Sequence, residues 1–305
     1  MGGDWLKGID PTRFDHQVYT LFRLGHFLGI MDDVVDLGRG AYELIKKRII
    51  PGCEPFKAAV RSFQSSNACG REGNLVPLTI DGEFGPMTSQ AVRQRFCGSP
   101  DVLPRGGKPR WGKHDLVVWH DMSQLRGVTF EEAKTVYMEA CDMITEVCNL
   151  NFTWGTSYNI FAHARRIDGG GGTLAWSYLP SGDQYNGRPL EQRYDTAENF
   201  GGNRLRTFCR PTMCHEILHA VGLGHSRDPN DIMYPSINGT QKPASGDIRE
   251  LVARYGQPVP TDPDEPDPPD GPPPSPTDVI KDGDHVVIEG KIRKLGPSVW
   301  TITSS

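Results

Sequence analysis

The stretch HEILHAVGLGH, residues 215–225, restricts the fold more than any other part of this chain. His215 and His219 are four residues apart, so a helix presents both imidazoles on one face. Gly222 can adopt a positive φ and end that helix abruptly, which lets the chain return and present His225. The pattern therefore predicts a helix, a sharp turn and three imidazole nitrogens around one point.

Three histidines leave the fourth position of a tetrahedral zinc ion open, which is the arrangement of a catalytic zinc site. Glu216 is adjacent to these ligands in sequence, where it can act as general base for a bound water molecule. Zinc lowers the pKa of that water from about 15.7 towards 7. The alternative is a helix whose histidines only satisfy hydrogen bonds in a core. The combination of three histidines, a glutamate and a glycine at these spacings disfavours it.

Charge and hydropathy exclude two classes of partner. The formal net charge of −5 over 305 residues gives no basis for nucleic-acid binding. No run approaches the roughly 18–20 apolar residues that span a bilayer. The first residues, MGGDWLKGIDPTRFDHQ, lack a continuous apolar core and so do not resemble a signal peptide. We expect a secreted, extracellular protein whose signal is missing from this numbering; another export route or an intracellular location are the alternatives.

The chain has seven cysteines. An oxidising compartment would allow three disulfides, and once one thiol is set aside the remaining six can pair in about 15 ways. The sequence does not choose among these pairings, and a reduced chain is the alternative.

Hydrophobic spacing divides the chain into two main parts. Apolar residues recur at helical spacing within 15–50, 55–64 and 88–96, which predicts a small helical unit. Beyond it, short apolar runs alternate with helical patterns. Thr129 and Glu132 form a capping-box pattern before the longest of these helices. The alternation predicts an α/β or α+β domain.

The longer stretch HEILHAVGLGHSRDPNDIMYP resembles the zinc site of a metzincin, and specifically of a matrixin. In that family Met233 would form the methionine turn beneath the metal. The resemblance covers most of residues 55–256, from FKAAVRSFQ through GGKPRWGKHDLVVWH to GDIRELVARYG. It implies an α+β catalytic domain with a twisted mixed sheet and long helices, preceded by a small all-α propeptide domain.

Composition and the resemblance together predict six segments. Residues 257–277 are rich in Pro and Asp, so they form no core and are expected to be a stiff linker. The predicted segments are a helical N-terminal extension (1–50), a propeptide resembling a peptidoglycan-binding domain (51–97), an exposed activation connector (98–110), the matrixin-like catalytic domain (111–256), the linker (257–277) and a short β-hairpin-like tail (278–305).

Cys97 lies in the stretch RFCGSPD, which resembles the Pro-Arg-Cys-Gly-x-Pro-Asp segment of matrixin zymogens. The resemblance implies that its thiolate fills the open zinc position of a latent enzyme. Phe96 stands where the family has arginine, and Arg95 lies one position early. The alternative is that Cys97 forms a disulfide and another cysteine is free.

The stretches RIDGGGGTLAWSYL and EQRYDTAENF resemble a calcium-binding region of the same family. Calcium takes six to eight oxygen ligands, and an ordinary glycine-rich loop is the alternative. Two positions of the family's structural zinc are Trp176 and Arg193 here, so we expect one zinc only. The implied calcium ligands are the carboxylates of Asp168, Asp195 and Glu198 and the backbone carbonyls of Gly169, Gly171 and Thr173.

These features predict a latent metalloendopeptidase that cleaves peptide bonds of extracellular proteins after an activating protease removes the propeptide. Zinc is the expected catalytic cofactor and calcium a second one. The strand TLAWSYL would pair with an extended substrate, and Tyr234 and Pro235 would wall its pocket. The alternatives are a cell-wall (peptidoglycan)-binding protein with an accessory peptidase domain, and an inactive peptidase scaffold.

Overall fold

The computed structural model describes residues 9–71, 74–93, 97–101, 109–180, 189–259, 292–294 and 300–302. The chain divides into two compact units, residues 1–259 and 260–305. In the second unit, β8 (Ile292–Lys294) pairs with β9 (Trp300–Ile302) in antiparallel fashion, as the hairpin prediction requires. Most of the predicted linker, from residue 260 onwards, lies outside the described residues, as do residues 102–108 of the connector.

The first part of unit 1 is helical and has one hydrophobic core. Its helices are α1 (Phe14–Arg23), α2 (Arg39–Arg48), α3 (Glu54–Gln64) and α4 (Pro86–Arg93). The core draws on both sides of the boundary predicted at residue 50, because Leu21 and Phe27 pack in the same cluster as Val60 and Phe63. We call residues 9–93 the helical unit.

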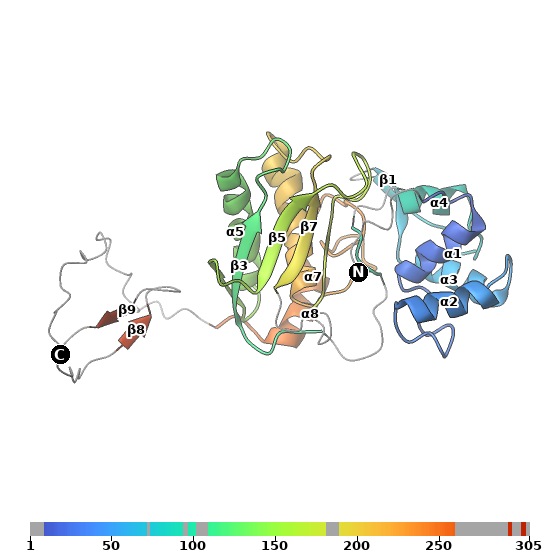
Figure 1. Ribbon diagram of the computed structural model, residues 1–305, viewed down its shortest axis with the longest axis horizontal. Coiled ribbons are helices and arrows are strands. Elements are labelled where there is room, and N and C mark those ends of the chain that lie inside the picture. Colours follow the sequence, from blue (N-terminus) through green and yellow to red (C-terminus); the bar gives the residue numbers. More distant parts are fainter. Residues whose placement is uncertain are drawn as a thin grey trace. The chain divides into compact units, whose positions relative to one another are not determined.

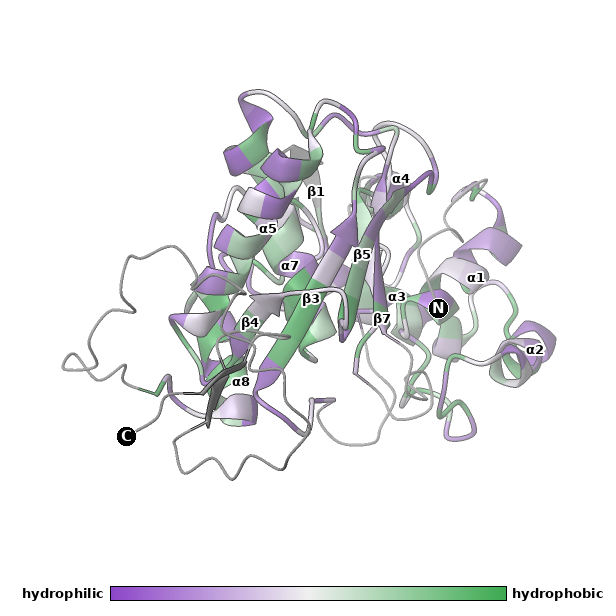
Figure 2. Ribbon diagram, turned by 60° about the vertical axis from the view of Figure 1, so that its left-hand side comes forward, coloured by the Kyte–Doolittle hydropathy of each residue, from purple (hydrophilic) through white to green (hydrophobic). Residues whose placement is uncertain are grey.

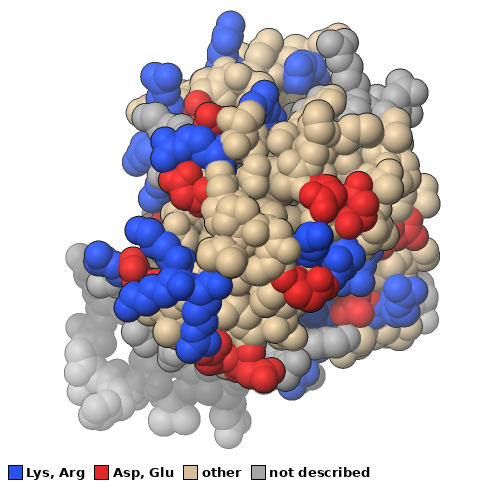
Figure 3. All heavy atoms as spheres, turned by 90° about the vertical axis from the view of Figure 1, so that its right-hand side faces the viewer, with Lys and Arg blue, Asp and Glu red and all other residues tan. Residues whose placement is uncertain are grey.

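The helical unit is not entirely α. The strands β1 (Ala68–Arg71) and β2 (Asn74–Pro77) form a short antiparallel pair that the hydrophobic spacing did not predict. On the face shown in Figure 3, Lys and Arg side chains are interspersed with Asp and Glu rather than gathered by sign. That mixture is consistent with the mild net charge.

The second part of unit 1 is built on a five-stranded mixed sheet in the order β4-β3-β5-β7-β6. All neighbours are parallel except β6, which runs antiparallel to β7. This confirms the predicted α+β class. The strands are β3 (Asp115–Asp121), β4 (Asn151–Trp154), β5 (Ile160–Arg165), β6 (Ala175–Ser177) and β7 (Leu190–Asp195).

Two long helices, α5 (Phe130–Thr145) and α7 (Arg210–Ala220), lie side by side against one face of the sheet (Figure 1). The predicted capping box begins α5: Glu132 N–H donates to Thr129 Oγ1 (3.2 Å), and Thr129 N–H donates to Glu132 Oε2 (2.8 Å). Figure 2 shows the hydrophobic middle of β3, where Leu116 and Val118 are fully buried. The last helix, α8 (Ser245–Tyr255), completes the unit.

Candidate metal centre

Helix α7 carries the first two histidines and ends as the sequence predicts. Gly222 has a φ of 102°, and its N–H donates to His219 O over 2.8 Å. A Cβ at this position would lie 1.9 Å from Pro109 O. Glycine is therefore required at position 222 for two reasons, namely its positive φ and the close approach of the backbone at Pro109.

Two aromatic side chains from distant segments bind the carbonyl groups at the end of α7. Trp111 Nε1 donates to Ala220 O (2.8 Å), and Tyr255 Oη donates to Val221 O (2.8 Å). The Tyr255 hydroxyl also accepts from Trp111 N–H (3.1 Å). These bonds satisfy carbonyls that a helix end leaves open, and they fix the turn that returns the chain to His225.

Four side chains meet where the sequence predicts a metal. One donor atom from each of Cys97, His215, His219 and His225 lies within 4.8 Å of the others. Among the residues that the structure describes, no other group of three or more His, Cys, Asp or Glu side chains meets as a candidate metal site. His219 Nε2 lies 3.2 Å from His225 Nε2 and 3.4 Å from Cys97 Sγ.

The hydrogen bonds of the three imidazoles fix which nitrogen is available to a metal. His215 Nδ1 lies 2.6 Å from Ile232 O, and His219 Nδ1 lies 2.7 Å from Leu223 O. A carbonyl oxygen only accepts, so these Nδ1 atoms carry the protons and the Nε2 atoms keep their lone pairs. His225 Nδ1 faces Asp101 Oδ1 at 2.8 Å and is oriented in the same way.

This spacing fits a zinc ion. Two lone pairs at 3.2 Å repel each other unless a cation lies between them. Ligands at about 2.05 Å in a tetrahedron are separated by about 3.3 Å, and a thiolate at about 2.3 Å lies about 3.5 Å from each nitrogen. The His219–His225 and His219–Cys97 distances are close to these values.

Glu216 is buried beside the group, with 1% of its surface exposed. Burial raises the pKa of Glu216 to about 8, while the neighbouring Cys97 thiol acts to lower it. A carboxyl group with a pKa near neutrality can both accept and donate a proton in one reaction cycle, which is what a general base and acid requires.

The turn beneath the histidines depends on a residue that the sequence analysis did not single out. Met233 is buried, as a methionine turn requires. Asp247 on α8 accepts from Ile232 N–H (2.9 Å) and Met233 N–H (3.3 Å). Ile232 O in turn accepts from His215 Nδ1. Asp247 therefore fixes the orientation of His215 without contacting the metal ligands itself. Its only sequence signal is an acidic residue in the first turn of the last helix.

The carboxylates of the predicted calcium site lie near one another but accept backbone N–H groups. Asp195 Oδ2 accepts from Gly169 N–H (2.9 Å), and Asp168 Oδ1 accepts from Thr173 N–H (3.0 Å). Glu198 accepts from Gly171 N–H. Burial and the negative charge of Asp195 raise the pKa values of Asp168 and Glu198. A cation at this site would relieve that repulsion.

A different arrangement occupies the strand positions of the family's structural zinc. His163 on β5, Arg193 on β7 and Trp176 on β6 are neighbours in the sheet. His163 Nε2 and Arg193 Nε each lie 2.6 Å from Glu191 Oε1, and the Arg193 guanidinium lies over the Trp176 ring at 5.0 Å. These side chains form an ion-pair and cation–π cluster.

The segment of Cys97 lies along β6, the strand predicted to bind substrate. Cys97 and Ala175 form a parallel bridge, and Gly98 N–H donates to Ala175 O over 3.1 Å. Ser99 Oγ donates to Ser177 O over 3.1 Å. The pocket beside this segment is lined by His215 and Glu216 together with the predicted wall residues Tyr234 and Pro235.

The cysteines do not form the predicted disulfides. Cys53, Cys141, Cys148, Cys209 and Cys214 are free, Cys97 contacts His219 at the candidate metal site, and the side chain of the seventh, Cys69, is outside the description. Three disulfides would need six paired thiols, so that interpretation is wrong and the reduced alternative holds. Cys141, Cys209 and Cys214 are fully buried on helices of the catalytic core.

The fold, the three histidines and the buried glutamate define a zinc metalloendopeptidase. Comparison with known families gives the particular type: residues 110–256 match the matrixin family model. The chain is 28% identical to matrilysin from Felis catus over 201 residues, which cover 59% of this chain and 74% of that protein. Human matrilysin is 27% identical over 201 residues, which cover 59% of this chain and 72% of that protein.

Mouse matrix metalloproteinase-25 is 27% identical over 238 residues, which cover 68% of this chain and 38% of that protein. Residues 110–256 thus resemble a matrixin domain, and the chain is a metalloendopeptidase, a hydrolase whose cofactors are a catalytic zinc ion and calcium. No helix among the described residues is long and apolar enough to cross a membrane. The cell-wall alternative and the activating protease stay predictions, since these comparisons bear on neither.

Proposed function

We propose that this chain is a latent zinc endopeptidase that cleaves extracellular proteins and is inhibited by Cys97 until the segment after it is cut. The observation that carries the proposal is the meeting of Cys97 Sγ with three histidines, one of them 122 residues away in sequence. Three histidines alone would leave a zinc position for substrate. A thiolate in that position removes it.

The chain's own residues have separate tasks in the proposed reaction. His215, His219 and His225 hold the metal, which when bound supplies a Lewis acid for the scissile carbonyl and activates water. Glu216 takes a proton from the attacking water and passes it to the leaving amine. The buried position that brings its pKa to about 8 suits it to both transfers.

Latency in this proposal has a chemical and a steric part. Ser99 N–H donates to Cys97 Sγ over 3.4 Å, which favours negative charge on the sulfur. Because Cys97 is tethered, its effective concentration at the metal is high. The same segment pairs with β6 at Ala175, so the edge that would bind an extended substrate is covered.

Activation would follow a cut in the predicted connector, residues 98–110. The described part of this segment contradicts the predicted exposure, because Gly98 and Ser99 are buried and the Asp101 side chain is 1% exposed. The cut is therefore expected after Asp101, where the sequence is rich in Gly, Pro, Lys and Arg, a composition typical of protease-sensitive loops. Because the relatives named above are matrix metalloproteinases and matrilysins, we propose that the substrates are extracellular matrix proteins. The proposed calcium ligands are the carboxylates of Asp168, Asp195 and Glu198 and the backbone carbonyls of Gly169, Gly171 and Thr173.

The test uses the full-length chain with zinc and calcium and a casein or gelatin digest. Cys97→Ser should cleave without activation, whereas the wild type should cleave only after treatment with a thiol modifier. Cys53→Ser, a free cysteine of the helical unit outside the site, is the matched control and should stay latent. A Cys97→Ser protein that remains inactive while it binds zinc would refute the proposed latency.

The role of Glu216 needs a separate variant. Glu216→Ala combined with Cys97→Ser should abolish cleavage while the zinc content per chain stays unchanged, because the three imidazoles remain. Cleavage retained in that double variant would show that another group transfers the proton.

A further inference from the structure

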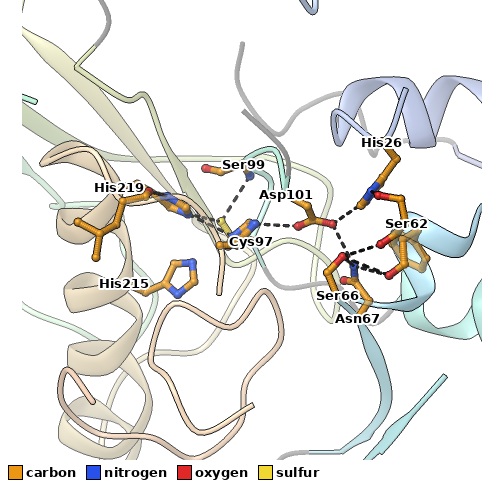
Figure 4. Close-up of polar contacts among 12 residues, drawn as sticks. His26, Ser62, Ser66, Asn67, Cys97, Ser99, Asp101, His215 and His219 are labelled. Atoms are coloured by element: carbon orange, nitrogen blue, oxygen red, sulfur yellow. Dashed lines mark hydrogen bonds and ion pairs between the residues drawn. The ribbon is translucent and has the colours of Figure 1, made fainter. Parts of the chain in front are cut away.

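Asp101, which orients His225, is also bound by two residues of the helical unit. Asp101 has a fully buried side chain, with 1% exposed, and its Oδ1 lies 2.8 Å from His225 Nδ1. Its Oδ2 lies 2.9 Å from His26 Nε2 and 3.0 Å from Asn67 Nδ2. Figure 4 shows Asp101 between the Cys97 site and these two residues.

His26 is itself fixed in place. It follows α1 after a turn at Gly25, whose φ is 85°, and its side chain is fully buried. Its Nδ1 lies 3.0 Å from Ser62 Oγ, and its ring meets the Phe63 ring edge-on at 5.4 Å. With the Ser62 hydroxyl donating to Nδ1, the proton of a neutral His26 is on Nε2, where it points at Asp101.

The main chain joins the same two segments. Asp101 N–H donates to Leu24 O over 3.0 Å, two residues from His26. Leu24 and Phe27 are fully buried in the core of the helical unit, so this stretch is anchored by packing. The backbone bond and the side-chain bond together hold Asp101 against a rigid part of the helical unit.

A buried carboxylate needs its donors. It is stable when several N–H groups face it, and each charge-assisted hydrogen bond is stronger than a neutral one. Asp101 receives one donor from the metal site and two from the helical unit. Only three residues separate Asp101 from Cys97, so movement of the aspartate displaces the thiol.

We propose that His26, with Asn67 as its partner, is a positioning residue for latency: it holds Asp101 so that Cys97 stays at the metal site. This inference rests on the proposed function, because it assigns the helical unit a role in that inhibition. Residues of the predicted N-terminal extension, more than 70 positions before Cys97, thereby control release of the thiol. Loss of the His26 contact loosens Cys97 without any cut in the connector.

The test measures how fast Cys97 becomes accessible in the zinc-loaded, full-length chain. Alkylation of Cys97 by a maleimide is followed by peptide mass spectrometry, which resolves it from the other cysteines. Because Cys97 is buried, its rate reports the opening equilibrium. Removing a charge-assisted hydrogen bond changes such an equilibrium by roughly 10- to 100-fold.

We expect His26→Ala to accelerate alkylation by about 10-fold or more and His26→Gln, which keeps an N–H donor, to accelerate it less. His16→Ala is the matched control, a histidine of α1 that bonds the backbone of Asp10 instead of Asp101. It should react at the wild-type rate. A wild-type alkylation rate in His26→Ala would overturn the proposal.

A second comparison separates positioning from general loosening of the helical unit. Val60→Ala removes packing from the core of the helical unit, in the same cluster as Phe63. The thermal midpoints of Val60→Ala and His26→Ala show whether the two variants are equally stable. If Val60→Ala accelerates Cys97 alkylation as much as His26→Ala at equal stability, the specific role of His26 is wrong. If only His26→Ala does so, the proposal holds.

Failure of this inference can be told apart from failure of the proposed function. Cys97→Ser that cleaves constitutively, together with unchanged alkylation in His26→Ala, removes only the role of His26. Zinc-loaded Cys97→Ser that stays inactive removes the proposed inhibition itself.

Discussion

His120 on β3 should make the stability of the catalytic domain depend on pH. The side chain is 0% exposed, and neither ring nitrogen has a hydrogen-bond partner. Its ring centroid lies 4.7 Å from that of Phe130 and 4.7 Å from that of Trp154. Burial among these aromatic rings lowers the pKa of His120 from its usual 6.5 to about 4, because the charged form loses its hydration.

The sign follows from linkage. In the unfolded chain His120 binds a proton below pH ~6.5, whereas in the folded chain it does so only below pH ~4. The contribution of neutral His120 is therefore complete above pH ~6.5 and is lost as the pH falls towards 4. A difference of about 2.5 pKa units corresponds to about 3 kcal/mol in total, of which about 2 kcal/mol is lost by pH 5.

The measurement is urea unfolding of the full-length chain at several pH values between 5 and 7.5, for the wild type and His120→Phe. Trp119 and Trp154 are close enough to the site to report unfolding by fluorescence. The other titrating groups are the same in both proteins, so they cancel in the difference between the two curves. His120→Phe should remove the part of the acid-induced loss of stability that is assigned to His120. The control His114→Phe, at an exposed histidine, should retain that loss.

The two stability curves should therefore diverge by about 2 kcal/mol between pH 7.5 and pH 5. Parallel curves would refute the reasoning, because they would mean that His120 gains its proton equally in the folded and unfolded chain. An NMR titration of the His120 ring gives a direct second reading of the same pKa.

Three further predictions concern the metal sites. Gly222→Ala should lower the thermal midpoint and the zinc content, since its Cβ would meet Pro109 O at 1.9 Å; an unchanged midpoint would contradict this. Asp247→Asn should weaken zinc binding in chelator competition by roughly 10-fold, because it disturbs the turn that orients His215; unaltered affinity would contradict it. Removal of calcium should lower the thermal midpoint of the wild type more than that of Asp195→Asn, and equal shifts would remove Asp195 from the calcium site.

Hydrophobic spacing located most helices and strands because their apolar faces repeat at short range. It did not identify β7, whose sequence LEQRYD places Gln192 between Leu190 and Tyr194 on the buried face. A polar residue in the middle of the buried face interrupts the apolar alternation by which a strand is detected. The π-helical turn Leu205–Cys209 before α7 was missed for a related reason, since a single widened turn has no periodicity of its own.

The sequence by itself determined the local geometry of the zinc site. The spacing of His215 and His219 follows from the helix repeat, and the turn at Gly222 follows from its freedom at positive φ. The resemblance to matrixin zymogens added Cys97 as a candidate fourth ligand. All these inferences depend on contacts within a few residues or on a pattern known from other chains.

Only the tertiary structure decided what surrounds that site. The approach of Cys97 to His219 spans 122 residues, and the contact of His26 with Asp101 spans 75. No periodicity encodes such distances, because they are set by how two hydrophobic cores pack and by where their helices end. A buried carboxylate, Asp101, thus links the helical unit to the metal site, and no local pattern connects it to His26.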